Sequence, residues 1–491
     1  MTALPYAFAR AHNVVVADGL CRFVTDTPLI ALAEAQRVSG HSLKFQAVSP
    51  TFLADAVQDT YRDSATAAAG AAEQASDHGD SDLATLADTA AAVDDLLDQR
   101  EDAPVVRLIN AILLEAIRAR ASDVHFEVEE SQLVVRFRVD GVLREALTSN
   151  RALAPQLVSR IKVMGRLDIA EKRLPQDGRV SLRVAEFHLD ARISTIPTQH
   201  GERVVLRLLD RGQTRTGITG LGMDAQMQAV FQRLLERPDG LILVTGPTGS
   251  GKTTTLYAGL DSLNDQQHNI MTIEDPIEYA LPGIAQMQVN TATDLTFARG
   301  LRALLRQDPN VIMVGEIRDG ETARVAVESA MTGHLVMSTL HTNSAIGSVA
   351  RLIDLGVERF LLGPMLRGLI AQRLVRRNCP SCAAVHTITQ AEEALLSHAI
   401  AKGETVLAGL GCAACNNTGF HGRVALYDLI EITPDLERAI TQGASESDLL
   451  SILNRSLPGL ISDGVRKIRD GLTTPQEVAR VVFDSAQEGA T

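Results

Sequence analysis

The chain has 491 residues, of which 45% are hydrophobic, and its formal net charge is −13. This length suffices for about three domains with separate cores, and no run of residues approaches the roughly 18 consecutive apolar positions of a membrane-spanning helix. The sequence has no Trp and few other aromatic residues, which disfavours nucleic acid as a partner because little material is left for stacking bases. We find no signal peptide, and five cysteines with two CxxC pairs suit a reducing compartment, so we expect a cytosolic protein.

The first hundred residues divide into a small module and a linker. Residues 1–62 contain apolar segments near 13–16 and 28–33 and are predicted to form an N-terminal module. Residues 63–99 are rich in Ala, Ser and Asp and carry most of the net negative charge of the chain. They hold too little bulky apolar surface to fold alone, so we predict a solvated acidic linker.

Residues 100–215 combine one helical pattern with several strand patterns. Apolar residues at helical spacing occupy 105–118, and alternation typical of a strand follows at 133–139, with a turn at Asp140–Gly141. Further strands are expected at 179–184, 187–195 and 203–209. We therefore predict an arginine-rich α+β domain.

From residue 216 onward, helical patterns alternate with short apolar strands, which is typical of a mostly parallel α/β sheet. We predict an α/β core over 216–375, a cysteine-containing subdomain over 376–425 and a C-terminal helical region over 426–491. The expected strands are 241–245, 270–274, 311–315 and 335–340, and the expected helices are 224–236, 251–264, 296–307, 320–332 and 344–355.

A phosphate-binding motif follows the first of these strands. Residues 246–253 read GPTGSGKT, which is the pattern GxxxxGK[ST] between a buried strand and a helix. The glycines allow a tight turn whose N–H groups point at phosphate oxygens, while Lys252 reaches the β- and γ-phosphates and the Thr253 hydroxyl ligates Mg²⁺. The nucleotide-binding residues are predicted to be Gly246, Pro247, Thr248, Gly249, Ser250, Gly251, Lys252, Thr253 and Thr254.

Acidic residues follow the next two strands. Glu274, Asp275 and Glu278 come at the carboxyl end of strand 270–274, where they can orient Mg²⁺ or the attacking water; the alternative is a capped turn. Glu316 ends the apolar run that starts at Val311, a Walker B arrangement with Glu in place of the commoner Asp. We predict that Glu316 holds the metal through its water shell or activates the lytic water.

Two histidines flank the strand 335–340. His341 follows the carboxyl end of this strand, where a sensor of the γ-phosphate would lie. His334 precedes the strand, and its position is equally compatible with a functional role and with a hydrogen-bonded residue of the core.

Four cysteines form two CxxC pairs separated by 29 residues. Each pair places two thiolates on one tight turn, and two such turns complete a tetrahedral S₄ site for structural zinc. The alternative, a redox CxxC, lacks a thioredoxin-like unit around it. We expect a helical insertion near 391–401, a buried apolar role for Cys21, and metal ligation by Cys379, Cys382, Cys412 and Cys415.

Four of these motifs, in this order, resemble the Walker A, Asp box, Walker B and His box of the secretion-superfamily ATPases. They lie at 246–253, 272–279, 311–316 and 332–343. Within that superfamily the chain resembles the type II secretion ATPases of the GspE-like branch. The resemblance covers nearly the whole chain except the acidic linker, and it includes LPYAFA at 4–9, ASDVHFE at 121–127, RFRVDG at 136–141, LPQDGR at 174–179 and HGERVVLRLLD at 200–210.

The resemblance implies an architecture and a catalytic set. The core would be a RecA-like P-loop NTPase domain, preceded by an α+β PAS-like domain that covers the ATP site and carries Arg192 and Arg207 to the phosphates. Arg302 and Arg306 would serve similarly across a subunit boundary. For both pairs, surface ion pairs are the alternative. The implied catalytic residues are Glu316, Glu274, Lys252, His341, Arg192 and Arg207.

The resemblance also implies a function and partners. The chain would be a hexameric Mg²⁺-dependent ATPase, attached peripherally to the inner membrane through GspL-like and GspF-like platform proteins. It would drive pseudopilus assembly and protein export across the outer membrane. The alternatives are a type IV pilus assembly ATPase and a nucleotide-binding scaffold without useful turnover.

Overall fold

The computed structural model describes residues 12–17, 19–39, 43–49, 52–53, 56, 83, 103–184, 187–210, 216–265, 267–453 and 459–487. They belong to two compact units, Met1–Gln213 and Thr214–Thr491. The segment 4–9 and nearly all of the expected linker 63–99 lie outside the described residues. Within the described ranges, no helix combines the length and the apolar character needed to cross a bilayer.

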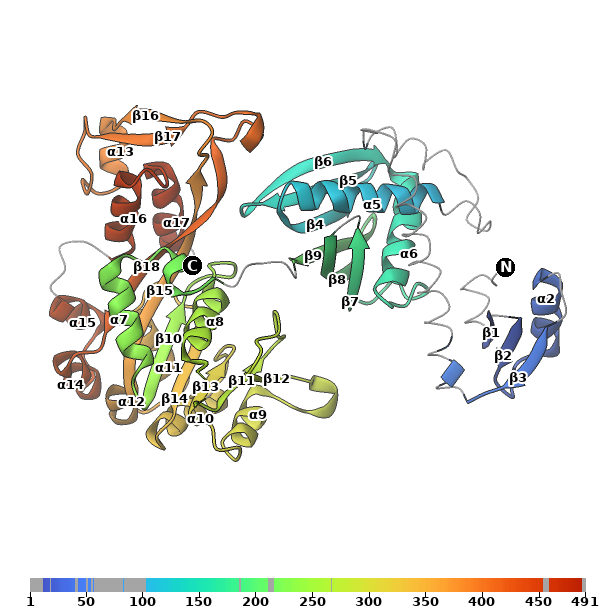
Figure 1. Ribbon diagram of the computed structural model, residues 1–491, viewed down its shortest axis with the longest axis horizontal. Coiled ribbons are helices and arrows are strands. Elements are labelled where there is room, and N and C mark those ends of the chain that lie inside the picture. Colours follow the sequence, from blue (N-terminus) through green and yellow to red (C-terminus); the bar gives the residue numbers. More distant parts are fainter. Residues whose placement is uncertain are drawn as a thin grey trace. The chain divides into compact units, whose positions relative to one another are not determined.

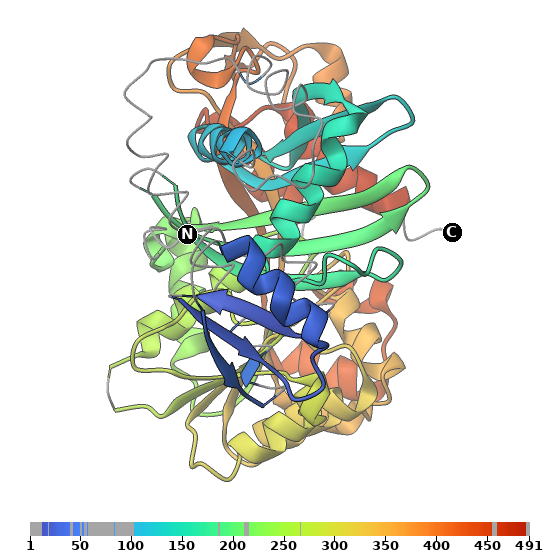
Figure 2. The same cartoon turned by 90° about the vertical axis from the view of Figure 1, so that its right-hand side faces the viewer.

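The N-terminal module is a small sheet with one helix across it (Figure 2). Strand β1 (Val14–Ala17) pairs antiparallel with β2 (Leu20–Phe23), which pairs parallel with β3 (Lys44–Ala47). The helix is α2 (Leu29–Ser39). Cys21 is fully buried in its core, as expected, and burial raises the pKa of its thiol to about 11.

The larger part of the first unit is a six-stranded antiparallel sheet with the order β6-β5-β4-β9-β8-β7 (Figure 1). The expected turn at Asp140–Gly141 joins β5 to β6, and both residues have positive φ values, 51° and 86°. Two helices and alternate residues of the strands form one apolar core, so the other face of the sheet carries the polar side chains. The elements are α5 (Ala103–Arg118), β4 (Ala121–Val128), β5 (Gln132–Val139), β6 (Val142–Asn150), α6 (Ala154–Met164), β7 (Gln176–Val184), β8 (Phe187–Thr198) and β9 (Gly201–Asp210).

The second unit is built on a seven-stranded sheet with the order β12-β11-β13-β14-β10-β15-β18. All neighbours in it are parallel except β15 and β18, which are antiparallel. The expected strands are confirmed, and the sheet extends beyond them on both sides. Its strands are β10 (Gly240–Thr245), β11 (Ile270–Glu274), β12 (Ala285–Gln288), β13 (Val311–Val314), β14 (Leu335–Leu340), β15 (Leu366–Asn378) and β18 (Phe420–Glu431).

Helices cover both faces of this sheet. Leu241 and Leu243 of β10 belong to the core formed with α9, α10 and α11, whereas Ile242 and Val244 belong to the core formed with α7 and α8. All four side chains are fully buried, as expected for a central strand of a parallel sheet. The helices are α7 (Ala225–Leu235), α8 (Lys252–Leu263), α9 (Phe297–Leu304), α10 (Gly320–Met331), α11 (Gly347–Asp354) and α12 (Arg359–Met365).

The cysteine-containing insertion is a hairpin with a short helix. Strands β16 (Ala383–Thr387) and β17 (Thr405–Gly409) pair antiparallel, and α13 (Gln390–Leu395) lies between them in the chain. The expected helix near 391–401 is therefore shorter. Ser397 and His398 have positive φ values, 53° and 63°, which a right-handed helix does not allow.

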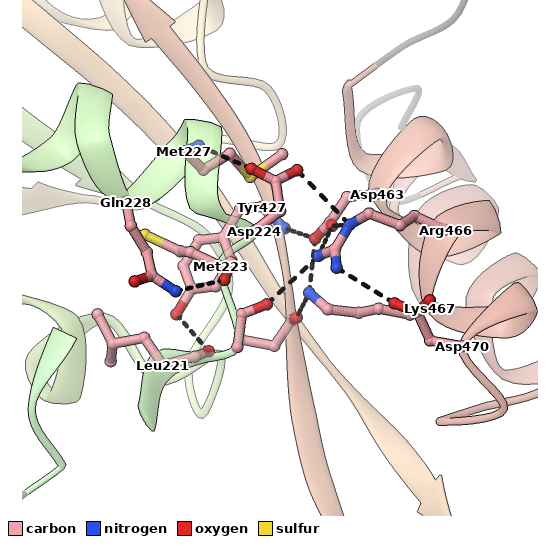
Figure 3. A network of polar contacts seen from close by, with 12 residues as sticks. Leu221, Met223, Asp224, Met227, Gln228, Tyr427, Asp463, Arg466, Lys467 and Asp470 are labelled. Carbon is pink, nitrogen blue, oxygen red and sulfur yellow. Dashed lines mark hydrogen bonds and ion pairs between the residues drawn. The ribbon is translucent and has the colours of Figure 1, made fainter. Parts of the chain in front are cut away.

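The described residues after β18 form the helices α14 (Pro434–Gln442), α15 (Glu446–Leu453), α16 (Gly459–Arg469) and α17 (Pro475–Gln487). Helix α16 carries an ion pair within the helix between Asp463 and Lys467, both side chains being fully buried, and these two residues also bind the backbone of β18 (Figure 3). The carboxylate of Asp463 also accepts the backbone N–H of Tyr427 at 2.9 Å and a hydrogen bond from Arg466. Lys467 in turn donates to the carbonyl of Ala425 on β18.

We predict that Asp463→Ala lowers the free energy of unfolding by about 3–5 kcal/mol, because Lys467 is left buried without its counter-charge. The measurement is urea unfolding of the full chain followed by circular dichroism. Asp470→Ala is the matched control: Asp470 pairs with Arg466 from the same helix at 3.3 Å but is 51% exposed. An equal effect of the two substitutions would contradict the prediction.

Candidate functional site

The glycine-rich loop occupies the carboxyl end of the central strand β10. Gly246, Gly249 and Gly251 have φ values of 151°, 79° and 89°, which only glycine adopts readily. A Cβ atom on Gly246 would lie 2.4 Å from the carbonyl oxygen of Gln372 on β15. The neighbouring strand therefore forms a wall against which the loop turns, and no other residue fits at position 246.

The start of α8 fits a phosphate group. Gly251 is the N-cap residue and supplies no side-chain cap, so the first N–H groups of the helix are left for another acceptor. The hydroxyl of Ser250 is buried and lacks a hydrogen-bond partner among the described residues. Thr253 follows in the first turn and is half-buried. These donors match the oxygens of a nucleotide phosphate chain.

Lys252 is the most strongly perturbed base at this edge of the sheet. The residue is 9% exposed, and its ammonium donates to the carbonyls of Gly246 at 2.6 Å and Pro247 at 3.1 Å. Burial lowers the pKa of Lys252 to about 8, and Glu316 partly offsets this effect. A phosphate would compensate the buried charge better than two carbonyl dipoles do.

Glu316 and His341 lie beside each other at the ends of two neighbouring strands, β13 and β14. The Nε2 atom of His341 is 3.3 Å from one oxygen of Glu316, and Arg318 contacts the other oxygen at 2.6 Å. Burial, followed by the charge of Lys252, lowers the pKa of His341. The structure thus brings Lys252, Glu316 and His341 to one edge of the sheet.

Glu274 occupies a different environment. It is 3% exposed at the end of β11, and its carboxylate accepts hydrogen bonds from Tyr257, from Thr272 at 2.6 Å and from Gln286 at 3.0 Å. Burial and the neighbouring carboxylate raise the pKa of Tyr257. Gly315 packs against the backbone of Glu274, so this acid is adjacent to the segment that carries Glu316. Its catalytic role stays a prediction.

His334 lies at the opposite end of β14 from His341. Its Nδ1 atom is 2.9 Å from the carbonyl oxygen of Ser329 and 3.1 Å from the Thr332 hydroxyl, which are contacts of a helix–strand connection. Because β14 runs parallel to β10, this end of the strand is the one away from the glycine-rich loop. A role for His334 at the phosphates has no support in this geometry.

Arg302 and Arg306 lie on the surface near the end of α9. Arg302 pairs with Glu321 at 2.6 Å, and Arg306 donates to the carbonyl of Arg302. Their expected role across a subunit boundary stays a prediction.

Sequence reasoning missed two buried polar residues that contact the loop, Gln372 and Arg373. Arg373 donates to the carbonyl of Asn343, two residues after His341, and its Nη1 atom would lie 3.1 Å from a Cβ on Gly246. Burial lowers the pKa of its guanidinium. The signal was present in the sequence as two polar residues inside the apolar run 369–375.

Thr255 connects the loop helix to Gln372 on β15 and to Tyr427 on β18. The buried hydroxyl of Thr255 on α8 donates to the Gln372 side chain at 2.8 Å and is 3.3 Å from the Tyr427 hydroxyl. The Tyr427 hydroxyl in turn donates to the carbonyl of Leu221 (Figure 3). Helix α8 is thus held by polar contacts as well as by its apolar face.

Arg192 and Arg207, the two arginines of the first unit that are predicted to contact phosphate, lie on neighbouring strands of its sheet. The register of β8 and β9 places Arg192 directly opposite Arg207. Arg207 is 55% exposed and pairs through Nε with Asp123 of β4 at 2.9 Å. Their contact with phosphate stays a prediction.

The four cysteines of the insertion come together as the spacing predicts. Neighbouring Sγ atoms are 3.8–3.9 Å apart, too far for a disulfide. Burial raises the pKa of Cys382 to about 11; the pKa of Cys415 is also raised by burial, but hydrogen bonds from the N–H groups of Cys412 and Gly419 bring it down to about 6. The donors and the spacing suit a cation held by thiolates.

A glycine-rich loop, a carboxylate and a histidine at one edge of a parallel sheet define a P-loop nucleotide hydrolase. Comparison with known families narrows this class. Residues 98–480 match the family described as Type II/IV secretion system protein, and residues 3–61 match a domain family described for GSPII protein E. The chain belongs to the Type II/IV secretion system protein family.

Curated relatives match along almost the full length. The Type II secretion system protein E of Pseudomonas aeruginosa is 52% identical over 485 residues, which cover 97% of this chain and 96% of the relative. The Type II secretion system ATPase E of Vibrio cholerae is 45% identical over 488 residues, which cover 98% of this chain and 97% of the relative.

Solved structures share the fold. The ATPase DotB of Legionella pneumophila has a TM-score of 0.57 at 20% identity, covering 77% of this chain and 95% of DotB. The pilus retraction motor PilT with bound ADP has a TM-score of 0.51 at 28% identity, covering 75% of this chain and 95% of PilT. The fold is that of the α/β secretion ATPases.

We predict that Thr255→Val lowers the free energy of unfolding by about 1–3 kcal/mol, because the buried Gln372 oxygen loses its donor while the shape of the side chain is kept. Urea unfolding of the full chain measures the change. Thr254→Val is the control for stability, since Thr254 is exposed on the same helix turn. A stability change confined to the control, or the same in both variants, would be inconsistent with this role.

Proposed function

We propose that this chain is the ATPase of a type II secretion system, hydrolysing ATP to ADP and phosphate to drive pseudopilus assembly and protein export across the outer membrane. The observation that carries the proposal is the convergence of Lys252, Glu316 and His341 beside the first N–H groups of α8. The near-full-length relatives named for type II secretion support the same system. A pilus assembly ATPase fits less well, since PilT is 28% identical where the type II relatives are 45–52% identical.

The residues at the sheet edge would have different roles in ATP hydrolysis, according to their chemistry. Lys252 and the N–H groups of the loop bind and orient the phosphates. Glu316 is placed to accept a proton from the attacking water, and His341 to donate a hydrogen bond to the terminal phosphate. Thr253 and Glu274 would hold Mg²⁺, which neutralises phosphate charge when bound.

The first unit would supply further positive charge. We propose that Arg192 and Arg207 contact the phosphates in the transition state, where charge on the transferring group is greatest. Their position opposite each other on one sheet face supports this role. We assign the sheet of β4–β9 with its two helices as the PAS-like domain, and the seven-stranded sheet as the RecA-like core.

The four cysteines would hold structural zinc. Zn–S bonds of about 2.3 Å in tetrahedral geometry separate the sulfurs by about 3.8 Å, the spacing observed here. Four thiolates complete the shell, so this zinc would hold the insertion together rather than bind substrate.

Assembly and location follow the same family. We propose a hexamer in the cytoplasm that attaches to the inner membrane through GspL-like and GspF-like platform proteins, the first contacted by the N-terminal module. The separate match of residues 3–61 to a domain family of GSPII protein E supports a distinct role for that module. A scaffold without turnover is disfavoured by the intact pair of Glu316 and His341.

The test of hydrolysis is Glu316→Gln. This isosteric change removes the proton acceptor, so we expect turnover of Mg-ATP to fall at least about 100-fold while ATP affinity stays within about threefold. Glu328→Gln is the control, since Glu328 is an exposed carboxylate on α10 that belongs to none of the predicted site residues. Bound ATP that is hydrolysed at the normal rate by Glu316→Gln would exclude the assigned role.

Metal content tests the cysteine site. The full chain should carry about one zinc per chain by atomic emission, and Cys412→Ser should lose it together with thermal stability. Cys21→Ala should keep the metal, because Cys21 lies in the N-terminal module. A chain whose metal content is unchanged by Cys412→Ser would refute the zinc site.

A further inference from the structure

The motif ASDVHFE at 121–127 has no role in the function proposed above. It forms strand β4, in which Val124 and Phe126 are buried in the apolar core against the helices. Since side chains alternate along a strand, Asp123, His125 and Glu127 share the opposite, polar face of the sheet. The motif therefore places an acidic strand in the middle of an arginine-rich face.

The register of the sheet aligns one charged residue from each of five neighbouring strands. Asp123 lies opposite Arg138 on one side and opposite Arg207 on the other, and Arg207, Arg192 and Arg179 follow in the same row. Like charges placed opposite each other on neighbouring strands repel. Asp123 is thus the one carboxylate in a row with four guanidinium groups.

The carboxylate of Asp123 is held firmly. Its side chain is 7% exposed, one oxygen accepts a hydrogen bond from the Ser122 hydroxyl at 2.8 Å, and the same oxygen lies 3.8 Å from Nε of Arg138. The other oxygen accepts from Nε of Arg207 at 2.9 Å. A buried acceptor in a defined position therefore orients an exposed arginine.

Asp123 contacts Arg207 at Nε, and this determines which nitrogens of the guanidinium remain available to bind a ligand. Because the bond is made through Nε, both terminal nitrogens of the guanidinium are left, and neither has a polar partner among the residues that the structure describes. Two parallel N–H groups are the arrangement that binds phosphate oxygens in a bidentate manner.

We propose that Asp123 is a positioning residue of the ATPase reaction, which holds Arg207 by Nε so that its two terminal nitrogens are presented to the phosphates of the nucleotide. The inference rests on the proposed role of Arg207. A solvent-exposed arginine that has to be ordered when it binds loses part of the binding free energy to that ordering. Asp123 orders Arg207 in advance.

The same strand provides a matched control. Glu127 also lies on the polar face of β4 and pairs with Arg136 and Arg203, with a side chain that is 12% exposed. Neither of these arginines belongs to the row of Arg207. Glu127→Gln therefore removes a similarly paired and largely buried carboxylate without affecting the row.

The experiment is a double-mutant cycle on the full chain, with steady-state hydrolysis of Mg-ATP and the thermal midpoint as readouts. Asp123→Asn and Arg207→Gln should each lower kcat at least about tenfold, with a much smaller change in KM, because the interaction acts mainly in the transition state. The double variant should be no slower than Arg207→Gln alone. Glu127→Gln should hydrolyse ATP at the normal rate.

The outcomes separate this inference from the function on which it rests. If Arg207→Gln is slow but Asp123→Asn has normal kcat, or if their effects multiply in the double variant, Asp123 does not act through Arg207 and the inference fails alone. If Arg207→Gln has normal kcat, the phosphate role of Arg207 fails and the inference fails with it. Should Asp123→Asn lower the thermal midpoint, Asp123→Glu keeps the charge but shifts the carboxylate, and a normal kcat in that stable variant would also overturn the proposal.

Discussion

The burial of one strand organises the nucleotide site. Strand β10 is covered on both faces and paired in parallel on both edges, and because β13 and β14 run in the same direction, all three strands end at the same edge of the sheet. Residues far apart in the sequence, Lys252, Glu316 and His341, therefore meet at one edge of the sheet. The wall formed by β15 then limits the loop to glycine at position 246.

Buried polar groups connect this edge to the C-terminal helices. A hydroxyl or charge removed from water needs a partner, and the partners here form a chain from Thr255 through Tyr427 to Asp463 and Lys467. Figure 3 shows the part of this chain from Tyr427 to Lys467. The helix that would bind phosphate and the helix α16 thus depend on the same strand, β18. The packing of the C-terminal region is part of the stability of the ATPase core.

The first unit is subject to a different constraint, the repulsion between like charges, because one face of its sheet is apolar and the other carries many guanidinium groups. Such a face repels itself unless carboxylates are interspersed. The strand at its centre supplies them in Asp123 and Glu127, each between arginines of the strands on either side. The same pairs that relieve repulsion give the arginine side chains defined directions.

Features that depend on neighbours along the chain could be predicted from the sequence. Apolar periodicity located the strands of the second unit, and short motifs located the glycine-rich loop and the two CxxC pairs, because their chemistry is contained within a few residues. Contacts between residues that are distant in the sequence are seen only in the folded chain. Gln372 and Arg373 lie beside the glycine-rich loop, and Asp123 lies beside Arg207, 84 residues away in the chain. The fold also shortened the expected helix near 391–401, since two residues there adopt positive φ. These outcomes depend on sheet order, register and local backbone geometry, which a single sequence does not specify.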